Sequence, residues 1–86
     1  MPKLEVKVVS AGWCQPCKNL KPVIKSVCED HDIELQVSDV DTKEGSSVSA
    51  QYGVRGVPTT FIFEGGEVKN TFVGMISRSE LEKSLN

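Results

Sequence analysis

The spacing of hydrophobic residues changes from that of a strand to that of a helix within the first third of the chain. Leu4, Val6 and Val8 alternate with charged residues, which is the period of two expected for a strand with one buried face. Further along, hydrophobic residues recur three or four positions apart, which places them on one side of a helix expected over residues 15–30. These positions are Leu20, Val23, Ile24, Val27 and Cys28.

A second alternating segment follows this helix. Ile33, Leu35 and Val37 are separated by charged or polar residues, and they predict a second strand with its hydrophobic side chains on one face. Because a helix connects the two strands, they should run parallel and form a βαβ unit.

The second half of the chain is expected to contain a short helix and a hairpin. The polar region Asp39–Ser49 leads into a helix that should end near Tyr52, with Gly53 as a left-handed cap. Two strands, Thr59–Phe63 and Val68–Val73, then flank a Gly-Gly pair at positions 65 and 66. Because glycine adopts positive φ angles without strain, this pair can form the tight turn of an antiparallel hairpin.

The last expected element is a helix. Ser77 and Glu80 have the spacing of a capping box, and Leu81 and Leu85 should turn inward from the helix that follows. The predicted order is therefore βαβαββα. We expect an α/β fold in which a four-stranded mixed sheet carries helices on both faces and residues 1–86 form a single domain.

Composition narrows the function classes. The 86 residues carry a formal net charge of −2, with the lysines spread among acidic residues, so we expect neither nucleic-acid nor membrane binding. The amino terminus has no apolar run of signal-peptide length, and the expected compartment is the cytoplasm. Three cysteines are present, and two of them lie three residues apart, a pattern that suits redox or metal chemistry in a reducing compartment.

The candidate chemistry lies where the first strand gives way to the first helix. The chain there reads Gly12-Trp13-Cys14-Gln15-Pro16-Cys17-Lys18. The unpaired N–H groups and the partial positive charge of a helix amino terminus stabilise an anion. A cysteine at the exposed start of the helix should therefore be acidic and nucleophilic, which indicates disulfide chemistry.

Several segments together resemble the thioredoxin family, over nearly the whole chain. They are Trp13-Cys14-Gln15-Pro16-Cys17-Lys18, Pro22 inside the first helix, Asp39-Val40-Asp41, Tyr52-Gly53-Val54-Arg55-Gly56-Val57-Pro58-Thr59, the Gly-Glu-Val of the hairpin and Val73-Gly74. The resemblance implies a thioredoxin-like fold trimmed to a minimal core, because thioredoxins usually carry a further strand and helix before the strand that leads to the motif.

The resemblance assigns different roles to the two thiols. Cys14 would attack a disulfide of a protein substrate and form a mixed disulfide, which Cys17 would resolve to leave a Cys14–Cys17 disulfide. Residues three apart in a first helical turn have Cα atoms roughly 5 to 6 Å apart, a separation that a disulfide tolerates. This reversible disulfide would be the redox centre, with no bound cofactor and no metal.

The resemblance also implies a docking surface around Cys14. Pro58 matches the cis-proline of the family, whose preceding residue, here Val57, would form strand-like hydrogen bonds with an extended substrate. The other residues expected on this surface are Trp13, Gln15, Pro16, Gly56, Val73 and Gly74.

The sequence departs from the family at three places. Gln15 stands where the family usually has glycine, which should change the redox potential and the substrate contacts. Thioredoxins commonly have a buried Asp six residues before the first cysteine and a Lys on the next strand, where this chain has Val8 and either Val37 or Ser38. With no buried base, water or the leaving thiolate of the substrate should accept the Cys17 proton, and an approach by Asp39 is the alternative.

Other residues with possible chemistry have structural interpretations. Cys28 lies roughly 16 Å along the helix from Cys17, too far for a disulfide, and is expected to be a buried structural thiol. His31 sits at a polar helix end and should cap it. Trp13 is expected at a contact surface rather than in the core, and Arg55 fits a partner contact and a solvated loop charge equally well.

Three functions remain open at this point. The first is a protein disulfide reductase, expected to be a monomer recharged by a thioredoxin reductase-type donor. Glutathione is the less favoured donor, because the segment Val73–Ser77 lacks the acidic residue that glutaredoxins use to hold it. The second is a thioredoxin-fold binding subunit with incidental redox activity. The third, a metal or iron–sulfur site, is disfavoured because one Cys-x-x-Cys pair supplies only two ligands.

Overall fold

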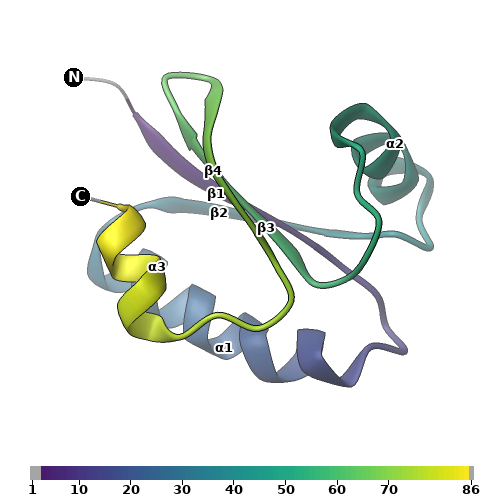
Figure 1. Cartoon of the computed structure of the whole chain (residues 1–86), viewed down its shortest axis with the longest axis horizontal. Coiled ribbons are helices and arrows are strands. Elements are labelled where there is room, and N and C mark those ends of the chain that lie inside the picture. Colours follow the sequence, from purple (N-terminus) through teal and green to yellow (C-terminus); the bar gives the residue numbers. More distant parts are fainter. Residues whose placement is uncertain (1–2, 86) are drawn as a thin grey trace.

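The computed structural model describes residues 3–85 and has the predicted order of elements (Figure 1). The strands are β1 (Leu4–Ser10), β2 (Glu34–Asp39), β3 (Thr59–Glu64) and β4 (Glu67–Val73), and the helices are α1 (Gln15–Asp30), α2 (Lys43–Tyr52) and α3 (Arg78–Ser84). The α/β class and the four-stranded mixed sheet are confirmed.

The sheet has the strand order β2-β1-β3-β4. β1 and β2 are parallel, as the crossover through α1 predicts, whereas β3 pairs antiparallel with both β1 and β4. Gly65 and Gly66 have φ angles of 61° and 86° and form the tight turn between β3 and β4. The carboxyl ends of β1 and β2 and the amino end of β3 therefore meet at one end of the sheet.

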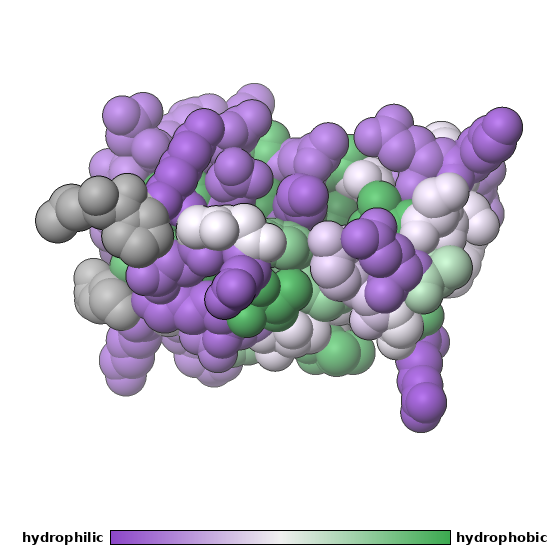
Figure 2. All heavy atoms as spheres, turned by 90° about the horizontal axis from the view of Figure 1, so that it is seen from above, coloured by the Kyte–Doolittle hydropathy of each residue, from purple (hydrophilic) through white to green (hydrophobic). Residues whose placement is uncertain are grey.

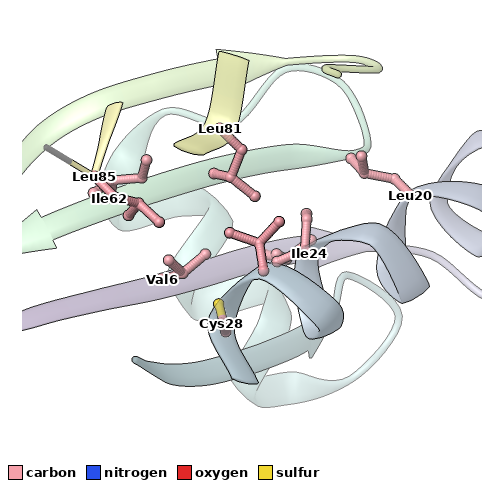
Figure 3. Close-up of a cluster of buried hydrophobic side chains, with 9 residues drawn as sticks. Val6, Leu20, Ile24, Cys28, Ile62, Leu81 and Leu85 are labelled. Atoms are coloured by element: carbon pink, nitrogen blue, oxygen red, sulfur yellow. The ribbon is translucent and has the colours of Figure 1, made fainter. Parts of the chain in front are cut away.

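Helices cover the two faces of the sheet unequally. In Figure 1, α1 and α3 lie on one face and α2 lies on the other, near the end where β1 leads into α1. The larger core lies under α1 and α3, where the predicted stripe of α1 meets the sheet and Leu81 of α3 (Figure 3). The smaller core contains Val9, Phe61 and Phe63, and partly buried residues such as Tyr52 of α2 pack on it.

The helix ends follow their sequence signals. Gly53 ends α2 in the left-handed conformation with φ 66°, and the Ser77 hydroxyl accepts a hydrogen bond of 3.1 Å from the Glu80 N–H at the start of α3. Leu81 and Leu85 are buried, as predicted. Within residues 3–85, no helix combines the length and the apolar character needed to cross a membrane.

One position on β2 departs from its predicted environment. Val37 remains 45% exposed, although its alternation with Leu35 predicts an inward-facing side chain. β2 is an edge strand, so Val37 has a neighbouring strand on one side only. Alternation identifies the face of a strand, whereas the depth of burial depends on where the strand lies in the sheet.

Candidate active site

The two cysteines of the motif lie where β1 leads into α1. Cys14 is the N-cap residue of α1, with an extended backbone (φ −91°, ψ 109°), and its Sγ accepts a hydrogen bond of 3.3 Å from the Cys17 N–H. The helix itself starts at Gln15, and Pro16 lies in the first turn, where its missing N–H leaves no hydrogen bond unmade. The Cys14 sulfur thus occupies the place where an N-cap side chain stabilises negative charge.

Both thiols are free, and Cys14 is more buried than the sequence predicts. Only 5% of the Cys14 surface is exposed, and Cys17 is fully buried. The prediction that Cys14 lies at an exposed helix start is therefore wrong. The reason is tertiary, because Ala11 and Val57 pack around the two cysteines and the Cys14 thiol points toward the Val57 carbonyl, 3.8 Å away.

The surroundings of Cys17 favour its protonated form. Burial, followed by the hydrogen bond with Cys14, raises the pKa of the Cys17 thiol, and the Ala11 backbone and the charge of Lys21 oppose this shift. No carboxylate is among the groups that shift it. A buried Cys17 beside the capped Cys14 gives the pair the asymmetry that ordered disulfide exchange requires.

Val8 occupies the position of the family's buried acid, and Val37 or Ser38 occupies the position of its lysine. Val8 and Val37 are register partners on β1 and β2. The carboxylate of Asp39, the alternative base, accepts the Asp41 N–H at 2.8 Å. Its other oxygen lies 3.8 Å from the point where a Cβ on Gly12 would be. Asp39 is not among the groups that shift the pKa of Cys17, so its carboxylate has no electrostatic effect on that thiol in this structure.

Contacts connect several of the residues expected to dock substrate. The Val57–Pro58 peptide bond is cis and Pro58 is buried, while the Pro58 carbonyl accepts the Gly74 N–H at 2.8 Å. Gly56 and Val73 also lie close together, since a Cβ on Gly56 would lie 4.0 Å from a methyl carbon of Val73. Trp13 and Val73 are each 71% exposed, and Gln15 and Pro16 are exposed in the first turn of α1.

Sequence reasoning missed two kinds of residue at this site. Met75 follows the Val73-Gly74 pair directly in the sequence and is 53% exposed, so we count it with the candidate docking residues; the signal that was available is an apolar residue in the irregular segment before α3. Ala11 and Val40 pack with the cysteines. Their contribution could not be inferred from sequence, because it depends on the ends of β1 and β2 lying beside each other.

Cys28 and His31 have structural environments. The Cys28 sulfur lies in the core under α1 (Figure 3), with 2% of the residue exposed, and burial raises its pKa to about 11. His31 caps the carboxyl end of α1, and its ring lies 3.2 Å from the Glu82 carboxylate of α3. Among residues 3–85, no three His, Cys, Asp or Glu side chains are grouped to hold a metal ion.

Comparison with known proteins connects this geometry to one family. A family model described as Thioredoxin matches residues 4–86. The thioredoxin of Porphyra purpurea is 36% identical over 76 residues, covering 88% of this chain and 71% of that protein. A thioredoxin of Pseudomonas aeruginosa is 40% identical over 76 residues, covering 88% of this chain and 70% of the relative.

Solved structures give the same result for the fold. A mutant thioredoxin from Halobacterium salinarum superimposes with a TM-score of 0.86 at 34% identity, covering 94% of this chain and 70% of that chain. The sequence and structure matches support disulfide chemistry and give no support to a binding subunit or a glutathione-dependent enzyme.

Proposed function

This chain belongs to the thioredoxin family and is a thiol–disulfide oxidoreductase, and we propose that Cys14 is its nucleophile and Cys17 its resolving thiol. The observation that supports this assignment is the asymmetry of the pair. Cys14 caps α1 and accepts the Cys17 N–H, whereas Cys17 is fully buried with a raised pKa. The sulfur at the helix cap is the better site for a thiolate at neutral pH.

The proposed reaction transfers two electrons to the disulfide of a protein substrate. The Cys14 thiolate attacks one sulfur, the disulfide of the substrate breaks, and its first thiolate leaves. Cys17 then gives its proton to water or to that thiolate and attacks the Cys14 sulfur. The second substrate thiolate leaves, so the substrate becomes a dithiol and the protein holds a Cys14–Cys17 disulfide.

The substrate would lie in an extended conformation along Val57. Cys14 points toward the Val57 carbonyl, so a chain that pairs with residue 57 brings its cysteine to the nucleophile. Exposed hydrophobic side chains at Trp13, Val73 and Met75 would contact it on both sides. Gln15, Pro16, Gly56, Pro58 and Gly74 complete the proposed surface.

A thioredoxin reductase-type donor would return the disulfide to the dithiol. We place the protein in the cytoplasm, where paired thiols stay reduced, and we assign it no bound cofactor beyond its own disulfide. It would act as a monomer, because Glu5 and Lys7 put charges on the part of the sheet face that α2 leaves open.

The first experiment is a redox titration of the whole chain with a Cys17→Ser variant as the trap. We expect one reversible two-electron transition, followed by Trp13 fluorescence, at a potential from roughly −200 to −270 mV. Cys17→Ser should accumulate a mixed disulfide through Cys14 when mixed with a disulfide-bearing peptide, and Cys14→Ser should not. A peptide adduct on Cys17 would reverse the assignment, and the absence of any reversible transition would refute the proposed function.

A further inference from the structure

A pocket opens beside the nucleophile, on the side of the sheet that carries α2. Its volume is about 340 Å³, and it lies between the active-site residues Trp13 and Val57 and the inner side of α2. Val40 contributes to its wall, and Val40 and Val57 also pack against the two cysteines. A group bound in this pocket would therefore contact Val40 and Val57, the side chains that also pack against the cysteines.

The pocket has a basic and hydroxyl-bearing side between its hydrophobic walls. Ser46 and Ser49 of α2 and Arg55 line it, and Arg55 is its only charged lining residue. Within residues 3–85, Arg55 takes part in no hydrogen bond or ion pair. In the same part of the chain, the Ser49 hydroxyl is buried without a hydrogen-bond partner.

Arg55 and the Ser49 hydroxyl favour the same kind of ligand. A buried hydroxyl without a partner destabilises a protein by about 1–3 kcal/mol, and a rotation of the Ser49 side chain toward the pocket would let its hydroxyl donate to an acceptor bound there. A guanidinium pairs best with a carboxylate, which can accept two parallel hydrogen bonds from it. Arg55 and Ser49 both offer donors, and a carboxylate accepts from both.

We propose that this pocket binds the carboxylate of an Asp or Glu side chain that lies within two residues of the reactive cysteine of the protein substrate. The proposal rests on the proposed function and specifies its substrate class. A segment paired with Val57 in extended conformation would direct its side chains alternately to opposite sides, and the pocket adjoins Val57 on the side of α2. The walls formed by Trp13 and Val40 would cover the methylene groups of the acidic side chain.

The test compares peptides that differ at one position. Each carries a single cysteine as a mixed disulfide with neutral 2-thiopyridine. In separate sets of peptides, the residue one or two positions before or after the cysteine is Glu, Gln or Leu. Release of pyridine-2-thione reports the attack of Cys14 on the disulfide of the peptide. We expect the Glu peptide to react roughly 1.5- to 5-fold faster than the Gln peptide at low ionic strength, the range for one exposed charged contact.

Variants then assign the preference to the pocket. Arg55→Gln should remove the preference for Glu, and Arg55→Lys should restore it only in part, because lysine lacks the two-pronged donor. Ser49→Ala should weaken it without loss of stability, since this hydroxyl has no partner to lose. Lys43→Gln, on the exposed side of α2 and outside the pocket, removes the same charge and should leave the preference unchanged.

The possible results separate the proposals. Equal rates for the Glu and Gln peptides, or a faster Leu peptide, would overturn the acidic subsite while leaving disulfide exchange intact. A rate dependent on Arg55 for glutathione disulfide but not for the peptides would also overturn it, because the ligand would then be glutathione. If no peptide releases pyridine-2-thione, the proposed function itself fails.

Discussion

At the scale of single residues, the chemistry depends on the different environments that the first turn of α1 gives the two thiols. The cap position gives Cys14 a hydrogen bond from the Cys17 N–H, while burial keeps Cys17 protonated. In the proposed reaction, this difference favours attack by Cys14 and delays the second step until Cys17 loses a proton. With Val8 where the family has its acid and Val37 or Ser38 where it has its lysine, no carboxylate or ammonium group at these positions assists that loss.

The pH dependence of the second step should follow the pKa of Cys17, because burial, the main cause that raises this pKa, persists when Cys14 is in the mixed disulfide. Only the thiolate attacks, so below that pKa the rate of resolution should rise about tenfold for each pH unit. Because the pKa lies above that of an ordinary thiol, about 8.5, the rise should continue without a plateau up to at least that pH. Double-mixing stopped flow, with a preformed Cys14 mixed disulfide and release of the second thiol as the signal, measures this rate.

Two lysines of α1 provide the control for this pH profile. Lys21 lowers the pKa of Cys17, so Lys21→Gln should move the profile to higher pH and slow resolution at pH 7. Lys25, exposed on the same helix and not among the groups that act on Cys17, should tolerate the same substitution without a shift. A plateau below about pH 8.5 in the unmodified protein would reveal a proton acceptor and contradict the prediction.

At the scale of elements, α2 is held against the end of β2 by an unusually close approach. The Asp39 carbonyl accepts the Thr42 N–H at 3.0 Å and the Thr42 hydroxyl at 2.7 Å, and that hydroxyl in turn accepts the Gly45 N–H at 3.0 Å. A Cβ on Gly45 would lie 1.7 Å from the Asp39 carbonyl oxygen. The junction can therefore form only with glycine at position 45.

Gly45→Ala should destabilise the protein although alanine is the better helix former. Helix propensity alone would stabilise the variant by about 1 kcal/mol, but a backbone clash of this depth forces α2 away from β2. Steric overpacking of this kind typically costs about 1–3 kcal/mol, so we expect a net loss in urea denaturation followed by circular dichroism. Because Ser46 and Ser49 move with α2, any preference for acidic substrates should fall as well.

Ser47→Ala is the matched control for that substitution. Ser47 is exposed on the same turn of α2, where alanine meets no clash, so its effect should be a small gain in stability of a few tenths of a kcal/mol. If Gly45→Ala were as stable as Ser47→Ala, the result would contradict the close approach of α2 to Asp39.

Sequence patterns predicted the elements because their signals are local. The stripe on α1, the Gly65-Gly66 turn and the Ser77 cap each involve residues a few positions apart. The burial of Cys14 depends on Val57, which lies 43 residues away, and the exposure of Val37 depends on the strand order. The pocket was beyond sequence reasoning for the same reason, since it exists only where α2 and residues 54–57 meet Trp13.

At the scale of the whole molecule, the two faces of the sheet are covered to different extents. Among the described residues, α2 is the one helix on its face, and it lies toward one end of the sheet (Figure 1). Seen from above, this side of the molecule is mostly hydrophilic at its edges and shows hydrophobic side chains toward the middle (Figure 2). Glu5 and Lys7 of β1 face this side, and the Lys7 ammonium lies 4.7 Å from the centre of the Phe63 ring.

These two charged residues should keep the open part of the sheet from associating with a second copy. Replacing both with leucine would put two apolar side chains on this face, above the core that contains Phe61 and Phe63, and contiguous exposed apolar patches on monomers favour association. We expect the double variant Glu5→Leu/Lys7→Leu to form dimers or larger species as its concentration rises in sedimentation velocity, while the unmodified chain remains a monomer.

A polar double variant separates the loss of charge from the gain of hydrophobic surface. Glu5→Gln/Lys7→Gln removes the same two charges but adds no apolar group, so it should stay monomeric although the contact of Lys7 with Phe63 is lost. Association of the glutamine variant to the same extent would mean that charge repulsion keeps the chains apart. Association of the unmodified chain would show that Glu5 and Lys7 do not prevent association, and it would contradict the proposed monomer.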